Sequence, residues 1–516
     1  MGETPYLKKL CTVDLIGLAR RGGIKQNRTA HKIFRKKEIK IMKGKKLLAG
    51  VLSAAMVLGT MSFTAFAADE TEVSDATGFE AAITDNSISD IKLGSDIDLN
   101  TGLAVNYPNG SAKKVTIDLN DHELKISSGN LTLYNGEYSI GNGTINVENV
   151  EATTGEGLIR LAPHVAAEPA TLNLTDVTVK ANGYKAFTGL FMVEAPNELN
   201  LDNVTINADN AETNSGLIYG SPNPNSTVTI NNSTINADNC TGKIVYGCNT
   251  KINKSTINAD VTKDVFSSSS VVVTDSELNL TAGRAIFTDA GYDYGYVTTI
   301  VSGTLNVDGA LVNGVYEKKA PSTTLVVAPT VTVTLPEGTD PLPTAVAKIN
   351  DTYYTSIGEA IAAAQDGDIV TLVNDVKESI KIDAGKNITL DLNGKTLTNT
   401  DGEHTIENHG TLVVEDGSQN KTGKVDNITN GRISFVNYEG GEATLNGGSF
   451  DRSLENGKVG ATDDGCNSCY TIKNWGIMTI NENVSVNNNT DGQGGSSAIG
   501  NGYQSGANFD KHTNVT

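Results

Sequence analysis

The chain has 516 residues, and its 60 Asp and Glu outnumber its 40 Lys and Arg, which gives a formal net charge of −20 at pH 7. Fourteen of the basic residues but only three of the acidic ones precede position 47, so the remainder carries a net charge of −31. Such an acidic chain disfavours nucleic acid and anionic membranes as partners, and it suits divalent cations or a cationic ligand.

Residues 42–67 have the three parts of a secretory signal peptide. They open with a methionine and three lysines, continue as an apolar run and close with Ala65-Phe66-Ala67. We therefore expect a secreted or cell-surface protein without membrane insertion after cleavage. Because this signal has its own methionine, residues 1–41 are interpreted as an upstream extension from a mis-assigned start. A long n-region or a nucleic-acid-binding tail is the alternative.

One strand–turn–strand unit recurs along the rest of the chain. Typical copies read TLNLTDVTVKAN (171–182), ELNLDNVTINAD (198–209) and TVTINNSTINAD (227–238). Each half alternates apolar and polar residues with period two, which predicts a strand with one buried face. The turn holds Asn or Asp, which tolerate the left-handed backbone conformation of a sharp corner. The corner residues are Asn142, Asp176, Asn203, Asn232 and Asp275.

The spacing of the unit predicts the architecture. From Val179 to Leu305 the second apolar position advances by 27, 29, 22, 21 and 27 residues. A period of this length with short strands is typical of an all-β parallel β-helix. A leucine-rich repeat would need a Leu/Asn consensus and a helical segment, and a β-sandwich would show hairpin turns without a fixed period.

The start of this pattern occurs twice. The segments TGFE (77–80) and SIGE (356–359) have the spacing of a capping box before a short Ala-rich amphipathic segment. Matching strand sequences follow them, VTIDLNDHEL (115–124) and ITLDLNGKTL (388–397). A short helix protects the open end of a β-helix, where strand edges are unpaired.

We therefore expect two tandem β-helices, each opened by a capping α-helix. The first spans residues 69–335 and the second spans residues 349–516, with a proline-containing linker at 336–348. The second pattern stops in NFDKHTNVT without a closing repeat, so we expect this β-helix to be truncated and the chain to be a fragment of a longer one.

The segments YYTSIGEAIAAAQDGDIVTLVNDV (353–376) and ITLDLNGKTL (388–397) resemble the pectin-lyase-like, right-handed parallel β-helix superfamily. More narrowly, they resemble repetitive surface proteins of gut Firmicutes, and the resemblance covers most of residues 69–516. It implies a right-handed coil and display at the cell surface with adhesion or glycan contact, often without catalysis. A glycan or a host surface is then the expected partner, and no cofactor is implied.

Catalytic members of that superfamily cleave acidic polysaccharides with clustered carboxylates. Three short segments resemble polygalacturonase motifs: NTD (489–491), DD (463–464) and an approximate NHG (408–410). Their order along the chain is reversed, however. The order of the motifs along the chain determines which coil each one occupies, so the reversed order would not bring them together as in those enzymes. We therefore expect no catalytic residues. The alternative is a polysaccharide lyase or glycoside hydrolase acting on acidic plant or host glycans. It needs three or more carboxylates converging with a basic residue in one groove.

Repeated acidic residues and cysteines offer two further candidate sites. Asp209, Asp238 and Asp260 each end an INAD unit. They predict either a weak calcium-binding ladder or a solvated turn position that prefers Asp. The four cysteines after the signal form two pairs in different β-helices, and local disulfides are the simplest interpretation for an exported protein. The pairs are Cys240 with Cys248 and Cys466 with Cys469.

A row of ring-bearing residues lies in the second repeat region. His409, Tyr438 and Trp475 each follow an Asn at the same phase before successive strand units, and Asn501 continues the Asn series. We expect the Asn residues to form a structural ladder and the three rings to stack on the outer surface. Such a row is a candidate sugar-binding platform, and the alternative is that it only covers the outer surface.

Overall fold

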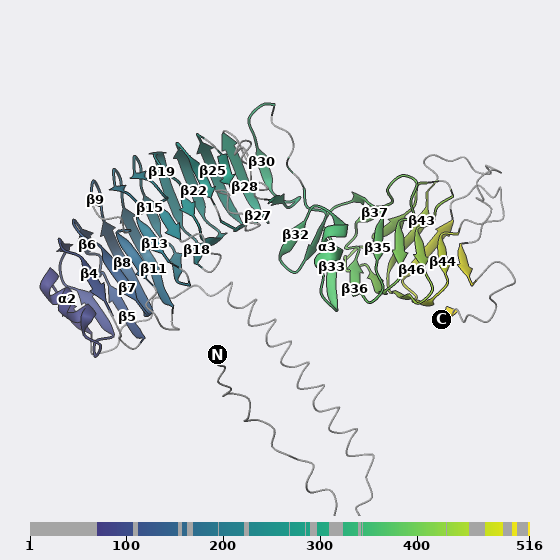
Figure 1. Ribbon diagram of the computed structural model, residues 1–516, viewed down its shortest axis with the longest axis horizontal. Coiled ribbons are helices and arrows are strands. Elements are labelled where there is room, and N and C mark those ends of the chain that lie inside the picture. The colour runs from purple at the N-terminus through teal and green to yellow at the C-terminus, as the bar shows by residue number, and fades with distance from the viewer. Residues whose placement is uncertain are drawn as a thin grey trace, which may run out of the picture. The chain divides into compact units, whose positions relative to one another are not determined.

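The computed structural model of the chain consists almost entirely of short strands stacked in parallel (Figure 1). It describes residues 70–515 apart from 107–111, 153–156, 163–168, 195, 221–225, 268, 284, 289–296, 309–323, 339–341, 343, 430, 454–469, 489–497 and 503–513. The predicted upstream extension (1–41), the signal peptide (42–67), Cys466 and Cys469 lie outside the described residues. Within them, no helix is long and apolar enough to cross a membrane.

The first β-helix is built from three sheets. The strands of its nineteen-stranded sheet are β1 (Thr71–Val73), β2 (Asp90–Leu93), β3 (Ile97–Leu99), β5 (Lys113–Asp118), β6 (Glu123–Ile126), β8 (Gly136–Asn146), β11 (Ala170–Lys180), β14 (Glu198–Asp202), β15 (Thr205–Asn207), β18 (Thr227–Asn231), β19 (Thr234–Cys240), β21 (Asn249–Asn253), β22 (Thr256–Val261), β24 (Val271–Thr274), β25 (Ser276–Ala282), β27 (Val297–Ile300), β28 (Gly303–Asp308), β29 (Thr324–Val327) and β30 (Thr332–Thr334). Its eight-stranded sheet contains β4 (Leu103–Val105), β7 (Leu131–Tyr134), β10 (Ile159–Ala162), β13 (Phe191–Val193), β17 (Ile218–Gly220), β20 (Val245–Tyr246), β23 (Asp264–Ser267) and β26 (Ala285–Thr288). Its three-stranded sheet contains β9 (Glu151–Ala152), β12 (Lys185–Ala186) and β16 (Glu212–Thr213).

The register of these strands confirms the repeat. Each strand pairs in parallel with the equivalent strand one coil later, so Val179 lies opposite Ile206 and Ile206 lies opposite Ile235. The unequal advances along the sequence therefore fall in the turns between strands. The fold is a parallel β-helix, as predicted.

The predicted corner residues have the expected backbone conformation. Asn142, Asp176, Asn203, Asn232 and Asp275 all have positive φ angles, between 47° and 57°. The side chains also bond between coils, because Asn142 Nδ2 donates to a carboxylate oxygen one coil away at 3.1 Å and Asn232 Nδ2 does the same at 2.8 Å. Asn and Asp are therefore selected here both for the left-handed turn and for the bond along the stack.

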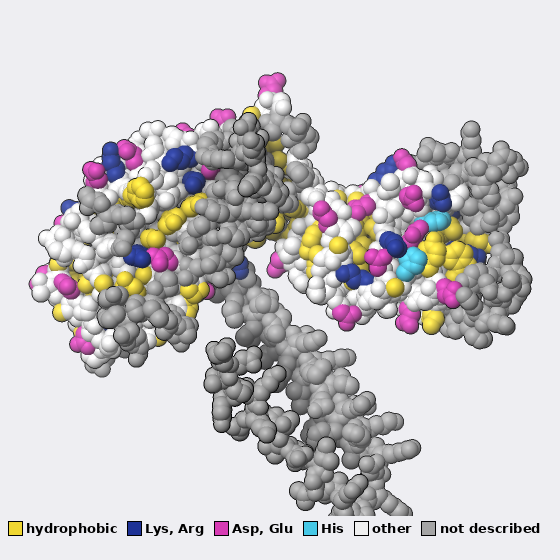
Figure 2. All heavy atoms as spheres, in the orientation of Figure 1, with side chains coloured by type: hydrophobic (Ala, Val, Ile, Leu, Met, Phe, Trp, Pro, Cys, Tyr) yellow, Lys and Arg dark blue, Asp and Glu magenta, His cyan; other side chains and the backbone are white. Residues whose placement is uncertain are grey.

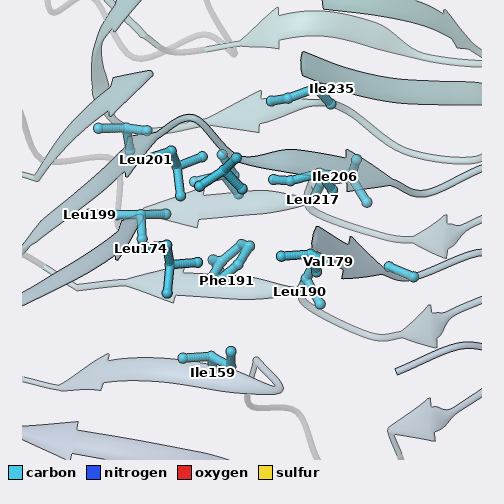
Figure 3. Packing of buried hydrophobic residues seen from close by; sticks show 14 of the residues in the cluster. Ile159, Leu174, Val179, Leu190, Phe191, Leu199, Leu201, Ile206, Leu217 and Ile235 are labelled. Atoms are coloured by element: carbon cyan, nitrogen blue, oxygen red, sulfur yellow. The ribbon is translucent and has the colours of Figure 1, made fainter. Parts of the chain in front are cut away.

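The core of the first β-helix is a continuous column of aliphatic side chains. Leu174, Leu201 and Ile206 are at most 2% exposed. Figure 3 shows side chains from several coils, including Phe191 and Leu217, pointing toward one another inside the coil. Burying apolar surface contributes about 25 cal/mol per Å² to the free energy of folding. This column is therefore the main stabilising contribution of the stack.

The second β-helix has its own sheets and its own buried cluster, from Ala347 to Met478. One sheet contains β31 (Ala347–Ile349), β32 (Thr352–Tyr354), β33 (Asp368–Leu372), β36 (Asn387–Asp391), β39 (Thr411–Glu415), β42 (Glu442–Leu445), β45 (Ile477–Ile480) and β48 (Asn514–Val515). The second contains β34 (Val376–Lys377), β37 (Thr396–Thr398), β40 (Lys424–Asp426), β43 (Gly448–Arg452) and β46 (Val484–Asn488). The third contains β35 (Ile380–Ile382), β38 (Ile406–Asn408), β41 (Phe435–Asn437), β44 (Ile472–Asn474) and β47 (Ile499–Asn501). Among the described strands, β31 alone pairs antiparallel, with β32 and β33.

Two short helices occur where the sequence predicts them, α2 (Ala76–Thr84) and α3 (Ile357–Ala363). The predicted N-cap of α2 was wrong, because Asp75 and not Thr77 accepts the hydrogen bond from the Gly78 N–H, at 2.7 Å. Asp is as good an N-cap as Thr, and it lies in the extended conformation that a cap needs.

The N-terminus of α3 is capped as predicted by Ser356, whose Oγ accepts from the Glu359 N–H at 3.3 Å. The box partner differs, however. Glu378, from the following coil, accepts from the Ile357 and Gly358 N–H groups at 2.9 and 2.8 Å, and its carboxylate also accepts from the Ser356 hydroxyl at 2.7 Å. A carboxylate at this position also interacts favourably with the helix dipole.

Candidate functional site

The candidate site lies on the sheet of β35, β38, β41, β44 and β47. Alternate residues of each strand point inward, and Ile406, Phe435 and Ile472 are completely buried. The last residue of each strand also points inward, and in four successive strands it is Asn. The residue after each Asn therefore points outward, and this is the position of His409, Tyr438 and Trp475.

The buried Asn residues form the predicted ladder. Asn408 Nδ2 donates to Asn437 Oδ1 at 2.7 Å, Asn437 Nδ2 donates to Asn474 Oδ1 at 2.8 Å, and Asn474 Nδ2 donates to Asn501 Oδ1 at 2.9 Å. Asn437 Nδ2 also donates to the Ile477 carbonyl at 3.0 Å. Each buried amide is thereby bonded along the stack and to the turn that follows. These hydrogen bonds hold in place the turn that carries each ring.

The three predicted ring positions form one continuous stack of half-buried side chains. The ring centroids of His409 and Tyr438 are 4.2 Å apart with an interplanar angle of 7°, which is a face-to-face stack. Those of Tyr438 and Trp475 are 5.4 Å apart with an angle of 48°. Stacked rings cover one another's faces, so the first two rings present mainly their edges to solvent. Trp475, the single tryptophan of the chain, breaks the parallel stack by its tilt.

Charged and polar groups surround the stack. Burial, together with the negative charge of Glu407, raises the pKa of Tyr438. His404 Nδ1 accepts from the Ile433 N–H at 2.9 Å, and burial lowers the pKa of His404. Figure 2 shows hydrophobic side chains gathered beside histidine side chains on the second β-helix, with charged side chains around them. The patch thus combines apolar ring surface with hydrogen-bonding edges, which is the chemistry that a sugar ring requires.

The Asp residues of the INAD units do not form a cation site in the described structure. The Asp209 carboxylate accepts from the Asp238 N–H at 3.0 Å, and the register shifts after Ala237, just before Asp238. Among the described residues, no group of three His, Cys, Asp or Glu side chains is arranged to hold a metal ion. The calcium ladder over Asp209, Asp238 and Asp260 is therefore not supported by the geometry.

The predicted disulfide between Cys240 and Cys248 is not formed. Both thiols are free and buried in the core of the first β-helix. Cys240 ends β19, whereas Cys248 follows β20 in another sheet. Burial raises the pKa of Cys240 to about 11 and that of Cys248 to about 12, so each behaves as a small apolar core residue.

Two places in the described structure bring carboxylates together. A cavity of about 510 Å³ is lined by Asp118, Asp121 and Asp176, but no Lys, Arg or His lines it. Elsewhere, Lys424 Nζ lies 3.0 and 3.2 Å from Asp426 and Asp451, which makes only two carboxylates. Asn408 and Gly410 of the approximate NHG motif bond to each other as part of the ladder.

A second ring pair was missed from the sequence. Tyr219 and Tyr246 are register partners in β17 and β20, and their centroids lie 5.6 Å apart at an interplanar angle of 16°. Lys243 Nζ lies 4.0 Å from the centroid of the Tyr246 ring. The signal was present as the matching segments LIYG (217–220) and IVYG (244–247), one coil apart.

The stacked parallel sheets define the class of the protein, a parallel β-helix, and one segment of the chain bears out the predicted resemblance. Residues 70–189 match the model of a family described as "Putative pectate lyase-like adhesive domain". No curated protein matches the chain. Among solved structures, an SRRP of L. reuteri 53608 is 15% identical, with a TM-score of 0.31 over 51% of this chain and 98% of that one. A mutant of the PL6 family alginate lyase AlyGC is 9% identical, with a TM-score of 0.23 over 81% of this chain and 75% of that one.

Proposed function

We propose that this chain is a non-catalytic, extracellular β-helix adhesin that binds carbohydrate through the outer ring stack of its second β-helix. The observation that carries the proposal is the stack of His409, Tyr438 and Trp475, ordered by a buried Asn ladder and half exposed at the surface. The match of residues 70–189 to an adhesive-domain family supports the adhesive role.

Within the stack, Trp475 is the residue that we expect to contact a sugar ring. The parallel geometry of His409 and Tyr438 leaves little ring face open between them, whereas the 48° tilt turns Trp475 out of that stack. An aromatic face binds the C–H groups of a pyranose, and neighbouring polar edges bind its hydroxyls. The hydroxyl of the neighbouring Tyr438 ring supplies such a polar group.

The alternative function, cleavage of an acidic polysaccharide, receives less support. It needs several carboxylates and a basic residue in one groove. In the described residues, the cavity lined by Asp118, Asp121 and Asp176 has no basic lining residue. The signal-like segment before position 68 and the acidic charge favour action outside the cell.

The proposal is tested by titrating the protein with plant and host glycans, following Trp475 fluorescence in the unmodified protein and calorimetry in every variant, because Trp475→Ala has no tryptophan. We expect a spectral change with at least one glycan class, and a loss of affinity of about 10-fold or more in Trp475→Ala, as for an interface hot spot. Tyr246→Ala, which removes a ring from the pair in the first β-helix, is the matched control and should bind normally. Equal binding by Trp475→Ala and the unmodified protein would contradict the proposal.

A further inference from the structure

A buried lysine lies next to the ring stack. Lys473 is the middle residue of β44, so its side chain points outward, in the row that Glu407 and Val436 occupy in the two preceding strands. In spite of this outward position, Lys473 is only 6% exposed. Its neighbour Val436 is 1% exposed, so the outer face is closely packed beside Lys473, whereas the adjacent Trp475 is half exposed.

Two rings surround the Lys473 ammonium. Its Nζ lies 4.5 Å from the ring centroid of Tyr470 and 5.6 Å from that of Trp475. Gly500, the next residue of the same row, makes room for this arrangement, because a Cβ there would lie 2.8 Å from the Tyr470 ring. Lys473 therefore lies in a recess with aromatic walls, and one wall is the ring that we expect to contact sugar.

The charge of Lys473 has no counterion in the described structure. No described carboxylate forms an ion pair with it. Glu407 lies two strands away in the same row, at about 10 Å, with Val436 between them. Burial lowers the pKa of Lys473, with no carboxylate to oppose the effect. Cation–π contacts compensate part of the cost of burying an ammonium, but an anion compensates it more fully.

We propose that Lys473 is a specificity-determining residue, whose ammonium binds an anionic substituent on the sugar that stacks against Trp475. The substituent is a carboxylate or a sulfate, two anionic groups that polysaccharides carry on their rings. This inference rests on the proposed function. It assigns to the site a preference for charged over neutral sugars that needs no metal ion, because the cation is supplied by the protein.

The test compares three hexasaccharides of equal length, one neutral, one of uronates and one sulfated, each titrated by calorimetry and Trp475 fluorescence in the presence of a chelator. We expect an anionic oligosaccharide to bind at least 10-fold more tightly than the neutral one, with an affinity that falls as salt rises. Lys473→Met should remove this preference, so that the ratio of anionic to neutral affinity falls to about one. Comparing the affinities for the uronate and the sulfated oligosaccharides shows whether the site prefers a carboxylate or a sulfate.

Lys381→Met is the matched control. Lys381 lies in the same outward row, three strands from Lys473, and its exposed ammonium pairs with Asp383 at 3.0 Å. This variant loses the same charge and should keep the preference. Thermal unfolding should show Lys473→Met to be at least as stable as the unmodified protein, since an unpaired buried charge is removed.

The outcomes separate the two proposals. If neutral and anionic sugars bind equally and perturb Trp475, or if Lys473→Met keeps the preference, the inference about Lys473 is wrong and the sugar site stands. If no oligosaccharide of any of the three kinds binds, the proposed function fails and the inference fails with it.

Discussion

At the scale of single residues, asparagine has two different structural roles in this protein. At the corners of the first β-helix it supplies a positive φ angle, as at Asn203 and Asn232. In the second β-helix, Asn437 is instead completely buried and bonds to Asn408 and Asn474 in the neighbouring coils. The first role is a property of the backbone, whereas the second depends on the stack, since a buried amide is tolerated only when its partners are in place.

The buried ladder predicts a clear cost for its loss. Asn437→Ala removes the bonds along the stack to Asn408 Nδ2 and Asn474 Oδ1, both inside the coil, and leaves these groups only their longer bonds to neighbouring turns. We expect the free energy of unfolding to fall by about 1–3 kcal/mol, measured by denaturant unfolding.

The control for this prediction is Asn236→Ala. Asn236 bonds in the same way to Asn207 and Asn258, at 2.9 Å each, but its ladder is half exposed on the outer face of the first β-helix. Water can replace those bonds, so a loss of less than about 1 kcal/mol is expected. Equal losses in the two variants would show that burial does not set the cost.

At the scale of elements, the first coils of each β-helix carry a short helix whose C-terminal end is bonded to a lysine of a following coil. Lys113 Nζ donates to the Asp85 carbonyl at 2.7 Å after α2, and Lys386 Nζ donates to the Ala364 carbonyl at 2.7 Å after α3. A lysine at the C-terminus of a helix satisfies free carbonyls and interacts favourably with the helix dipole. The sequence shows both helices but not these lysines, because their partners lie more than 20 residues away.

The cap of α3 is testable. Glu378→Ala removes the carboxylate that accepts from Ser356, Ile357 and Gly358, so we expect a loss of about 1–3 kcal/mol and a lower midpoint of thermal unfolding. Glu359→Ala removes the carboxylate of the predicted box, which contacts only the Thr355 hydroxyl, at 3.4 Å, and should change stability by less than about 0.5 kcal/mol. If Glu359→Ala lowered the stability more than Glu378→Ala, the predicted capping box of Ser356 and Glu359 would be supported instead.

At the scale of the whole molecule, the buried apolar residues fall into two separate clusters. One runs from Val73 to Val327 and the other from Ala347 to Met478. The same local structure opens both, since Asn120 and Asn393 have positive φ angles and their N–H groups donate to Asp118 and Asp391 at 2.9 Å. We propose on this basis that residues 69–335 and 349–516 are two modules.

Two modules with separate cores predict independent folding. Residues 69–335 expressed alone should give the circular dichroism of a β-protein and a cooperative thermal transition, because every coil except the last, whose Val327 pairs with Thr344, keeps its own neighbours. Its transition should coincide with one of those of the longer chain. An unfolded or aggregated product would show that the boundary near residue 335 is wrong.

The sequence by itself determined the features that repeat. Alternation with period two, corner Asn and Asp residues and the recurrence from Val179 to Leu305 each reflect contacts between equivalent residues of neighbouring coils, so a one-dimensional pattern records them. The outward row of His409, Tyr438 and Trp475 was predicted for the same reason. Only the tertiary structure decided how these rings lie, that Cys240 and Cys248 stay apart, and that Glu378 caps α3. These features depend on ring tilt, on the separation of sheets and on which coil a turn approaches, and none of them leaves a period in the sequence.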